Sequence, residues 1–222
     1  MTIARGARVA IVLATVAAAA PSAAVTEEEG GDIRGLTVGI AAAELPTAGL
    51  TGFTCAATGE VLPGWPAFAR CPAATPDRLR EVAVRYDETT QPWAAVNSTW
   101  EGTKLAGHPV LLSVLFDEAG IVQAIRAVTD PEAPPYLRKK AYLLYIRVMG
   151  RYGREGWACT DAAPGDRQPV GGLFIDRRCE KRLPDRTLVL QTDLYRASGQ
   201  AGRAYTDAAR FEIWRGAAPR RG

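Results

Sequence analysis

Apolar and polar residues alternate along several short stretches of the chain, and this spacing predicts β-strands. Val82, Val84 and Tyr86 occupy every second position of one stretch, as in a strand with a single buried face. The C-terminal part repeats the pattern in three stretches that predict antiparallel strands: residues 171–181, 186–195 and 209–215. We therefore expect much of the chain to fold as antiparallel sheet.

The clearest supersecondary element is a hairpin in the middle of the chain. Residues 110–116 (VLLSVLF) form a nearly continuous apolar run, and the DEAG sequence at 117–120 suits a turn. Residues 121–128 (IVQAIRAV) then run back. This pairing predicts two neighbouring antiparallel strands.

Two stretches have helical rather than alternating spacing. Pro134 and Pro135 suit the first turn of a helix, and the apolar positions from Leu137 to Tyr152 share one arc, which predicts a helix of about 18 residues that ends near Gly153. The sequence AAAELP at 41–46 predicts one or two further turns. The element order predicts an α+β fold: an antiparallel sheet packed by one long helix and a short N-terminal helix, with two disulfides.

The N-terminus has the features of an export signal. Arg5 and Arg8 precede a twelve-residue apolar run at 9–20, and small residues favour cleavage after Ala24. A run of this length is too short to span a bilayer, which requires about 20 residues. We expect residues 1–24 to be a signal peptide and residues 25–222 to form a single periplasmic or secreted domain without a transmembrane span.

The four cysteines predict disulfides. They are Cys55, Cys71, Cys159 and Cys179. All follow the predicted signal, and an even number in an oxidising compartment favours disulfides over free thiols. Three pairings are possible, and the short-range pairing places one bridge in each half of the chain. No two cysteines have the spacing of a structural zinc site, so we predict no metal and no cofactor.

Charge excludes one broad class of partner. The chain has 27 basic and 24 acidic side chains, and removal of Arg5 and Arg8 with the signal leaves 25 and 24, a net charge of +1. Dedicated nucleic-acid-binding domains usually carry a strongly basic face. We therefore predict that nucleic acid is not the partner.

The start of the first half holds a hydrophobic residue, a glycine, a short helix, a second glycine and a cysteine: Val38, Gly39, Leu45, Gly49 and Cys55. This pattern resembles the start of modules in the β-lactamase-inhibitor-protein-like fold and in small outer-membrane assembly lipoproteins. The second half matches more loosely because its predicted helix is longer. The resemblance implies a non-catalytic, protein-binding scaffold with two pseudo-repeated halves, residues 33–130 and 134–216, and it transfers no binding residue.

One loop and one helix edge are candidate binding sites. The loop residues are Trp93, Trp100, Glu101, Lys104 and His108, the only histidine. Exposed tryptophans at a loop tip would form a binding hot spot, whereas buried ones would cap the sheet. His108 has no recognisable catalytic partner and precedes a predicted strand, which favours a structural role. The predicted long helix adds a basic stripe: Lys140, Arg147, Arg151 and Arg154.

The sequence thus predicts an exported, non-catalytic protein that binds another protein in the cell envelope or outside the cell. Two alternatives stay open. One is a hydrolase that uses His108 and scattered carboxylates, for example at the acidic turns Asp87-Glu88 and Asp117-Glu118. The other is a protein that binds a small ligand or an anionic surface through the basic stripe.

Overall fold

A computed structural model describes residues 32–73, 77–87, 102–105, 107–138, 141–199 and 204–219, with the backbone alone at 135 and 141–143. The predicted signal at 1–24 lies outside these residues. None of the described helices is long and apolar enough to cross a membrane.

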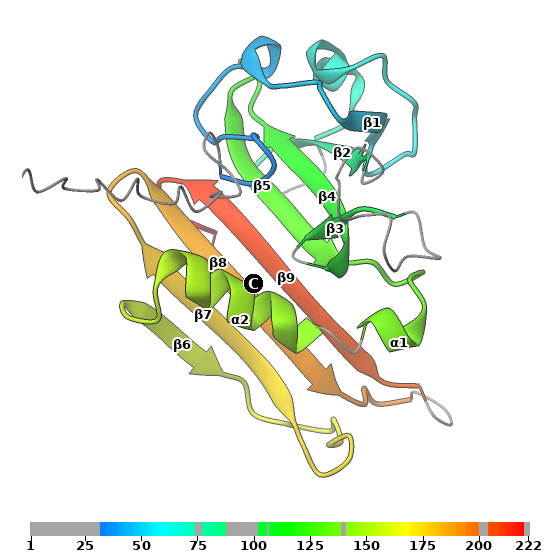
Figure 1. Cartoon of the computed structure of the whole chain (residues 1–222), viewed down its shortest axis with the longest axis vertical. Coiled ribbons are helices and arrows are strands. Elements are labelled where there is room, and N and C mark those ends of the chain that lie inside the picture. Colours follow the sequence, from blue (N-terminus) through cyan, green and yellow to red (C-terminus); the bar gives the residue numbers. More distant parts are fainter. Residues whose placement is uncertain are drawn as a thin grey trace, which may run out of the picture.

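Antiparallel sheet dominates the described part of the chain (Figure 1). Its nine strands are β1 (Leu50–Cys55), β2 (Arg80–Tyr86), β3 (Lys104–Leu105), β4 (His108–Phe116), β5 (Val122–Thr129), β6 (Trp157–Asp161), β7 (Ile175–Arg182), β8 (Arg186–Tyr195) and β9 (Thr206–Arg215). The strand order is β1-β2-β4-β5-β9-β8-β7-β6, and β3 adds to β4. The helical elements are the 3₁₀ segments η1 (Ala42–Glu44) and η2 (Trp65–Arg70) and the α-helices α1 (Pro135–Arg138) and α2 (Ala141–Tyr152).

The sheet consists of two meanders joined by their last strands. Strands β1, β2, β4 and β5 pair in succession, and so do β6, β7, β8 and β9. The two sets meet where β5 pairs antiparallel with β9, over five residue pairs from Ala124↔Trp214 to Val128↔Arg210. We call this pairing the seam. The division into pseudo-repeated halves stays a prediction.

The predicted α+β fold is wrong in its helical part. No long helix packs on the sheet: the predicted 18-residue helix is a four-residue turn, α1, and a three-turn helix, α2, among the described residues. The expected N-terminal helix is a single 3₁₀ turn, η1. Apolar spacing identified the buried Leu144, Val148 and Met149 but also included Ile146, which is 40% exposed, and it does not fix how many turns the chain completes. The alternation signal also missed β6, because four of its five residues are exposed.

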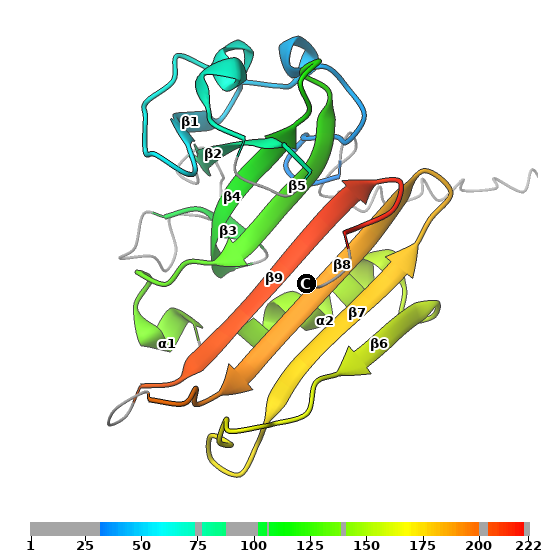
Figure 2. The same ribbon diagram turned by 180° about the vertical axis from the view of Figure 1, so that it is seen from behind.

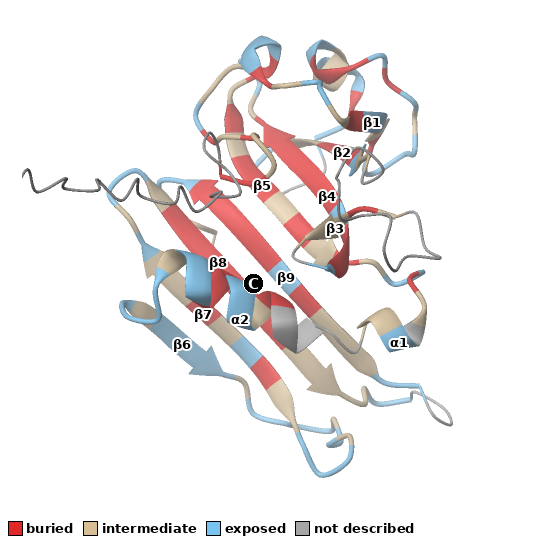
Figure 3. Cartoon of the chain, in the orientation of Figure 1, coloured by how far each residue is buried: buried red, intermediate tan, exposed pale blue. Residues whose placement is uncertain are grey.

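The main core lies on one face of the sheet, which we call the front. Helix α2 lies across β8 and β9 on this face and buries Leu144, Val148 and Met149 (Figures 1 and 3). In the first meander, Trp65 of η2 is 1% exposed and contacts Phe53 edge-on, with ring centroids 4.8 Å apart. Burial of these side chains is the main source of stability.

Both disulfides join residues of the same meander. Cys55 at the end of β1 bonds Cys71 after η2, and Cys159 of β6 bonds Cys179 directly opposite on β7. The described residues contain no free cysteine. Loops of this length contribute about 3 kcal/mol each in the chain-entropy model. The disulfides point to an oxidising, non-cytoplasmic location.

Candidate functional site

The structure separates the predicted site residues. Trp93, Trp100, Glu101 and Lys140 lie outside the described residues. Lys104 is half-buried in β3, where its carbonyl accepts a hydrogen bond from Arg34 Nη2 at 2.9 Å. His108 begins β4 on the adjacent strand. Arg147 and Arg151 lie on α2 and Arg154 on the loop after it, so the described residues do not unite the loop and the stripe in one contiguous site.

His108 is a buried structural residue. Its side chain has no exposed surface, and Nε2 lies 2.8 Å from Thr129 Oγ1. The Thr129 hydroxyl accepts a hydrogen bond from the Ala209 amide at 2.7 Å and donates one to the Ala209 carbonyl at 3.1 Å. Since the hydroxyl has one hydrogen, it must accept from His108 Nε2–H, which leaves Nδ1 unprotonated. These contacts tie β4 and β5 to β9 at one end of the seam.

The surroundings of His108 keep it neutral. Nδ1 is buried and has no hydrogen-bond partner in the described structure, so a proton there would find no acceptor. Burial lowers the pKa of His108 from 6.5 to about 4. A general base must reach substrate, and this imidazole is enclosed by the core.

The three described arginines of the basic stripe are exposed. Arg147, Arg151 and Arg154 lie on the outer side of α2 and on the loop that follows it, beside Ile146, which is 40% exposed. The Arg151 guanidinium lies 5.6 Å from the centroid of the Tyr152 ring. These arginines are accessible to a partner. A row of charged residues is also typical of the solvent-facing side of a helix.

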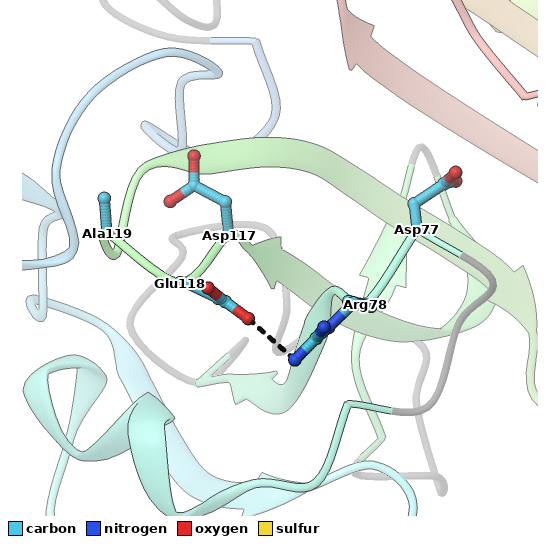
Figure 4. Close-up of a pocket in the computed structure, with 5 residues that line it drawn as sticks. All are labelled: Asp77, Arg78, Asp117, Glu118 and Ala119. Atoms are coloured by element: carbon cyan, nitrogen blue, oxygen red, sulfur yellow. Dashed lines mark ion pairs between the residues drawn. The ribbon is translucent and has the colours of Figure 1, made fainter.

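Turn chemistry accounts for the acidic pair after β4. Asp117 accepts hydrogen bonds from the Ile121 amide at 2.9 Å and from Gln123 Nε2 at 2.7 Å. Glu118 forms an exposed ion pair with Arg78 at 3.1 Å. Figure 4 shows that Glu118 turns toward Arg78, whereas Asp117 points away from that pair. These residues line an open hollow together with Asp77 and Ala119. No hydrogen bond joins two of its described carboxylates, as would be expected of an acid/base pair.

The back of the sheet, opposite α2, carries a second polar feature. Arg126 of β5 forms ion pairs with Glu212 of β9 at 2.7 Å and with Glu81 of β2 at 2.9 Å. Ser113 of β4 donates to Glu81 at 2.5 Å, and Trp214 Nε1 donates to Glu212 at 2.9 Å. We call Glu81, Ser113, Arg126 and Glu212 the charge ladder. It spans four neighbouring strands and crosses the seam.

The charge ladder is well suited to positioning and poorly suited to proton transfer. Burial alone would lower the pKa of Arg126, but attraction to Glu81 and Glu212 outweighs it and raises that pKa. The Arg126 side chain is 20% exposed and the Glu212 side chain 6%, so the pairs lie largely outside bulk water. Both carboxylates are occupied by one permanently charged guanidinium.

Next to the charge ladder runs a more exposed row. Leu111 of β4 pairs with Val128 of β5, which pairs with Arg210 of β9. Leu111 is 52% exposed and the Arg210 side chain 51%. Val128 between them is half-buried, and we call these three residues the exposed row after its two outer members. Figure 2 shows this back side of the sheet, where the described residues place no helix over the seam.

Part of the back is covered by the chain itself. Trp214, Val189, Leu115 and Leu79 form a small apolar cluster against which Ala218 packs. Downstream of β9, the Gly216 carbonyl accepts a hydrogen bond from Thr187 and the Pro219 carbonyl one from Arg178. The C-terminal segment therefore shields this end of the back, while no contact among the described residues places a covering segment over the exposed row.

The sequence contains a signal for the charge ladder that strand prediction alone does not use. Ser113 is the single polar residue of the stretch VLLSVLF, and Arg126 and Glu212 are charged residues flanked by apolar ones in IVQAIRAV and ARFEIWR. Each falls at an alternate position that faces the back. Only the pairing of β5 with β9, distant in sequence, shows that these positions are neighbours.

Comparisons of the chain with models of known protein families, with curated proteins and with solved structures find no match.

We predict that acid destabilises the protein through His108. Because its pKa is about 4 in the folded state and 6.5 when exposed, the unfolded chain binds the proton more tightly. Stability is therefore complete above pH 6.5 and falls as the pH drops toward 4, by roughly 3 kcal/mol in total. Urea titrations at pH 7, 6 and 5 will show this loss, and the His108→Gln variant will be nearly flat. A wild-type free energy of unfolding that does not change from pH 7 to 5 would contradict the assignment.

We predict that Arg126→Met destabilises the protein by about 3–5 kcal/mol, because it leaves the buried Glu212 and the half-buried Glu81 without a counter-charge. The matched variant Glu81→Gln/Arg126→Met/Glu212→Gln will recover most of this loss. Chemical denaturation of both variants provides the test. If Arg126→Met alone were within about 1 kcal/mol of wild type, the pairs would behave as solvated surface pairs.

Proposed function

We propose that this chain is an exported protein without catalytic activity that binds another protein in the cell envelope or outside the cell. The two disulfides support export, because such bonds persist in oxidising compartments. The resemblance of the first half to protein-binding modules supports the same class. The periplasm and the extracellular medium are both compatible with this proposal.

The observation that carries the proposal is the exposed row on the back of the sheet. Leu111 lies on an inner strand of the sheet and is 52% exposed, with Val128 and Arg210 in register beside it. Arginine is enriched in binding hot spots, and Leu111 adds apolar area beside Arg210 that a partner would cover.

The charge ladder beside the exposed row supports binding rather than catalysis. Its side chains are held by one another, so a partner that contacts this surface meets charges already fixed in place. Pre-ordered side chains reduce the entropy lost on association. A hydrolase built on His108 is less well supported, because that side chain is fully buried.

We predict that Leu111→Asp abolishes binding without unfolding the protein. Residue 111 is exposed, so the added carboxylate costs little in the free protein, whereas in a complex it would be buried without a counter-charge. In the test, tagged mature protein is cross-linked to the proteins around it in fractions of the cell envelope and of the culture medium. The cross-linked proteins are then identified by mass spectrometry. At least one partner recovered by wild type should be reduced by about tenfold or more, a loss of roughly 1.4 kcal/mol or more.

The matched control is Val61→Asp, which makes the same kind of change at a residue 73% exposed beside β1. It should retain the partner. A second control, Arg147→Ser/Arg154→Ser, tests the basic stripe. If wild type and Leu111→Asp recovered every partner equally, binding through the exposed row would be contradicted. If a partner were lost only with Arg147→Ser/Arg154→Ser, binding would be assigned to α2 instead.

A further inference from the structure

The two edge strands of the sheet, β1 and β6, differ in whether other parts of the chain cover them. At one end, residues 60–62 fold back onto β1: the Cys55 amide donates to the Glu60 carbonyl at 2.9 Å, and the Leu62 amide donates to the Phe53 carbonyl at 2.9 Å. A bridge between Thr54 and Val61 completes this cover. The edge of β1 is therefore occupied by the chain itself, a common protection against further strand pairing.

At the other end, β6 has no such cover among the described residues. Cys159 lies directly opposite Cys179 with the two Cα atoms 4.0 Å apart, as in a pair that exchanges no backbone hydrogen bonds. Ala158 and Thr160 therefore bond to β7, and the Ala162 amide continues that alternation by donating to Asp176 at 2.8 Å. The amides and carbonyls of the intervening residues point outward: Trp157, Cys159 and Asp161. No described residue bonds to these outward groups.

The β6 edge is also rigid. The disulfide fixes its centre to β7, and Asp161 accepts two hydrogen bonds from Arg177, at 2.7 and 2.9 Å. The Arg177 hydrogen bonds lower the pKa of Asp161, so the pair stays charged at neutral pH. A fixed strand with free backbone groups loses little conformational entropy when a second strand pairs with it.

We propose that β6 pairs antiparallel with β6 of a second copy of this chain, with Cys159 on the two-fold axis. In this register Trp157 faces Asp161 of the second copy, and all three outward residues take part. Six backbone hydrogen bonds then form, two for each residue pair. The two sheets become one continuous sheet with both α2 helices on the same face.

Charge disfavours two alternative registers, whereas the register with Thr160 on the axis also brings no like charges together. Moving the pairing so that Ala158 lies on the axis places Glu155 opposite Asp161, and moving it so that Asp161 lies on the axis places two aspartates together. Like charges directly opposite one another destabilise a sheet. With Cys159 on the axis no like charges meet, and the small residues Ala158 and Thr160 face each other across the other side of the pair.

Sedimentation equilibrium of purified mature protein over a wide concentration range tests the proposal. We expect a reversible monomer–dimer equilibrium, weak because the interface is small. Ala158→Glu/Thr160→Glu places glutamates opposite each other in the dimer and should give a monomer throughout. Ala158→Lys/Thr160→Glu places each introduced lysine opposite an introduced glutamate of the second copy and should tighten dimerisation by about tenfold through two cross-strand charge pairs.

Circular dichroism and thermal melting verify that each variant folds. In the Ala158→Lys/Thr160→Glu variant, the introduced lysine would face Glu180 and the introduced glutamate would face Arg178 within one copy, so both changes suit the monomer. Ala158→Lys/Thr160→Lys is the charge-reversed control and should also be monomeric.

Wild-type protein that stays monomeric at all concentrations would overturn the proposal and leave the edge to a strand of another protein. Dimers that all three variants leave unchanged would also overturn it, by placing the contact elsewhere. Neither result depends on the binding partner proposed above.

Discussion

The pairing of β5 with β9 is the contact on which the rest of the structure depends. Each meander alone would be a small sheet with one face to bury and one additional open edge. The seam removes that edge from both and brings residues 86 positions apart into register, such as Arg126 and Glu212. Side chains reinforce it on both faces: the charge ladder crosses it at the back, and the hydrogen bonds of His108 and Thr129 cross it at the front.

The same constraint divides the protein into a face for folding and a face for contact. The front collects the apolar side chains of both meanders beneath α2 and the N-terminal segment. The back can then hold charged residues, because cross-strand pairs satisfy them without a covering layer. Beside these pairs, the exposed side chains of Leu111 and Arg210 flank the half-buried Val128, and this mixed surface is the physical basis of the proposed binding role.

Local patterns in the sequence predicted the elements that carry their own signal. The hairpin of β4 and β5 and the strands β2, β7, β8 and β9 follow from alternation and turn chemistry. Strand β6 could not be found this way, because an exposed edge strand held by a disulfide needs no apolar alternation. The helix over residues 135–152 was overestimated because apolar spacing reports a buried face rather than a continuous backbone.

The candidate site was harder to predict than the fold. His108 was a candidate site residue because it is the only histidine, yet its buried environment makes it a neutral core residue. Glu81, Arg126 and Glu212 look ordinary in the sequence, and only the tertiary strand order brings them together. Trp93 and Trp100 of the predicted binding loop lie outside the described residues, so their contribution to binding stays a prediction.

Hydrogen exchange under native conditions tests most directly whether the seam makes the two meanders one cooperative unit. Amides of β5 and β9 at the seam should exchange only through global unfolding, and the most protected amides of β2 and β8 should report the same free energy. Two distinct free energies, one for each meander, with faster exchange along the β5–β9 pairing, would contradict this account.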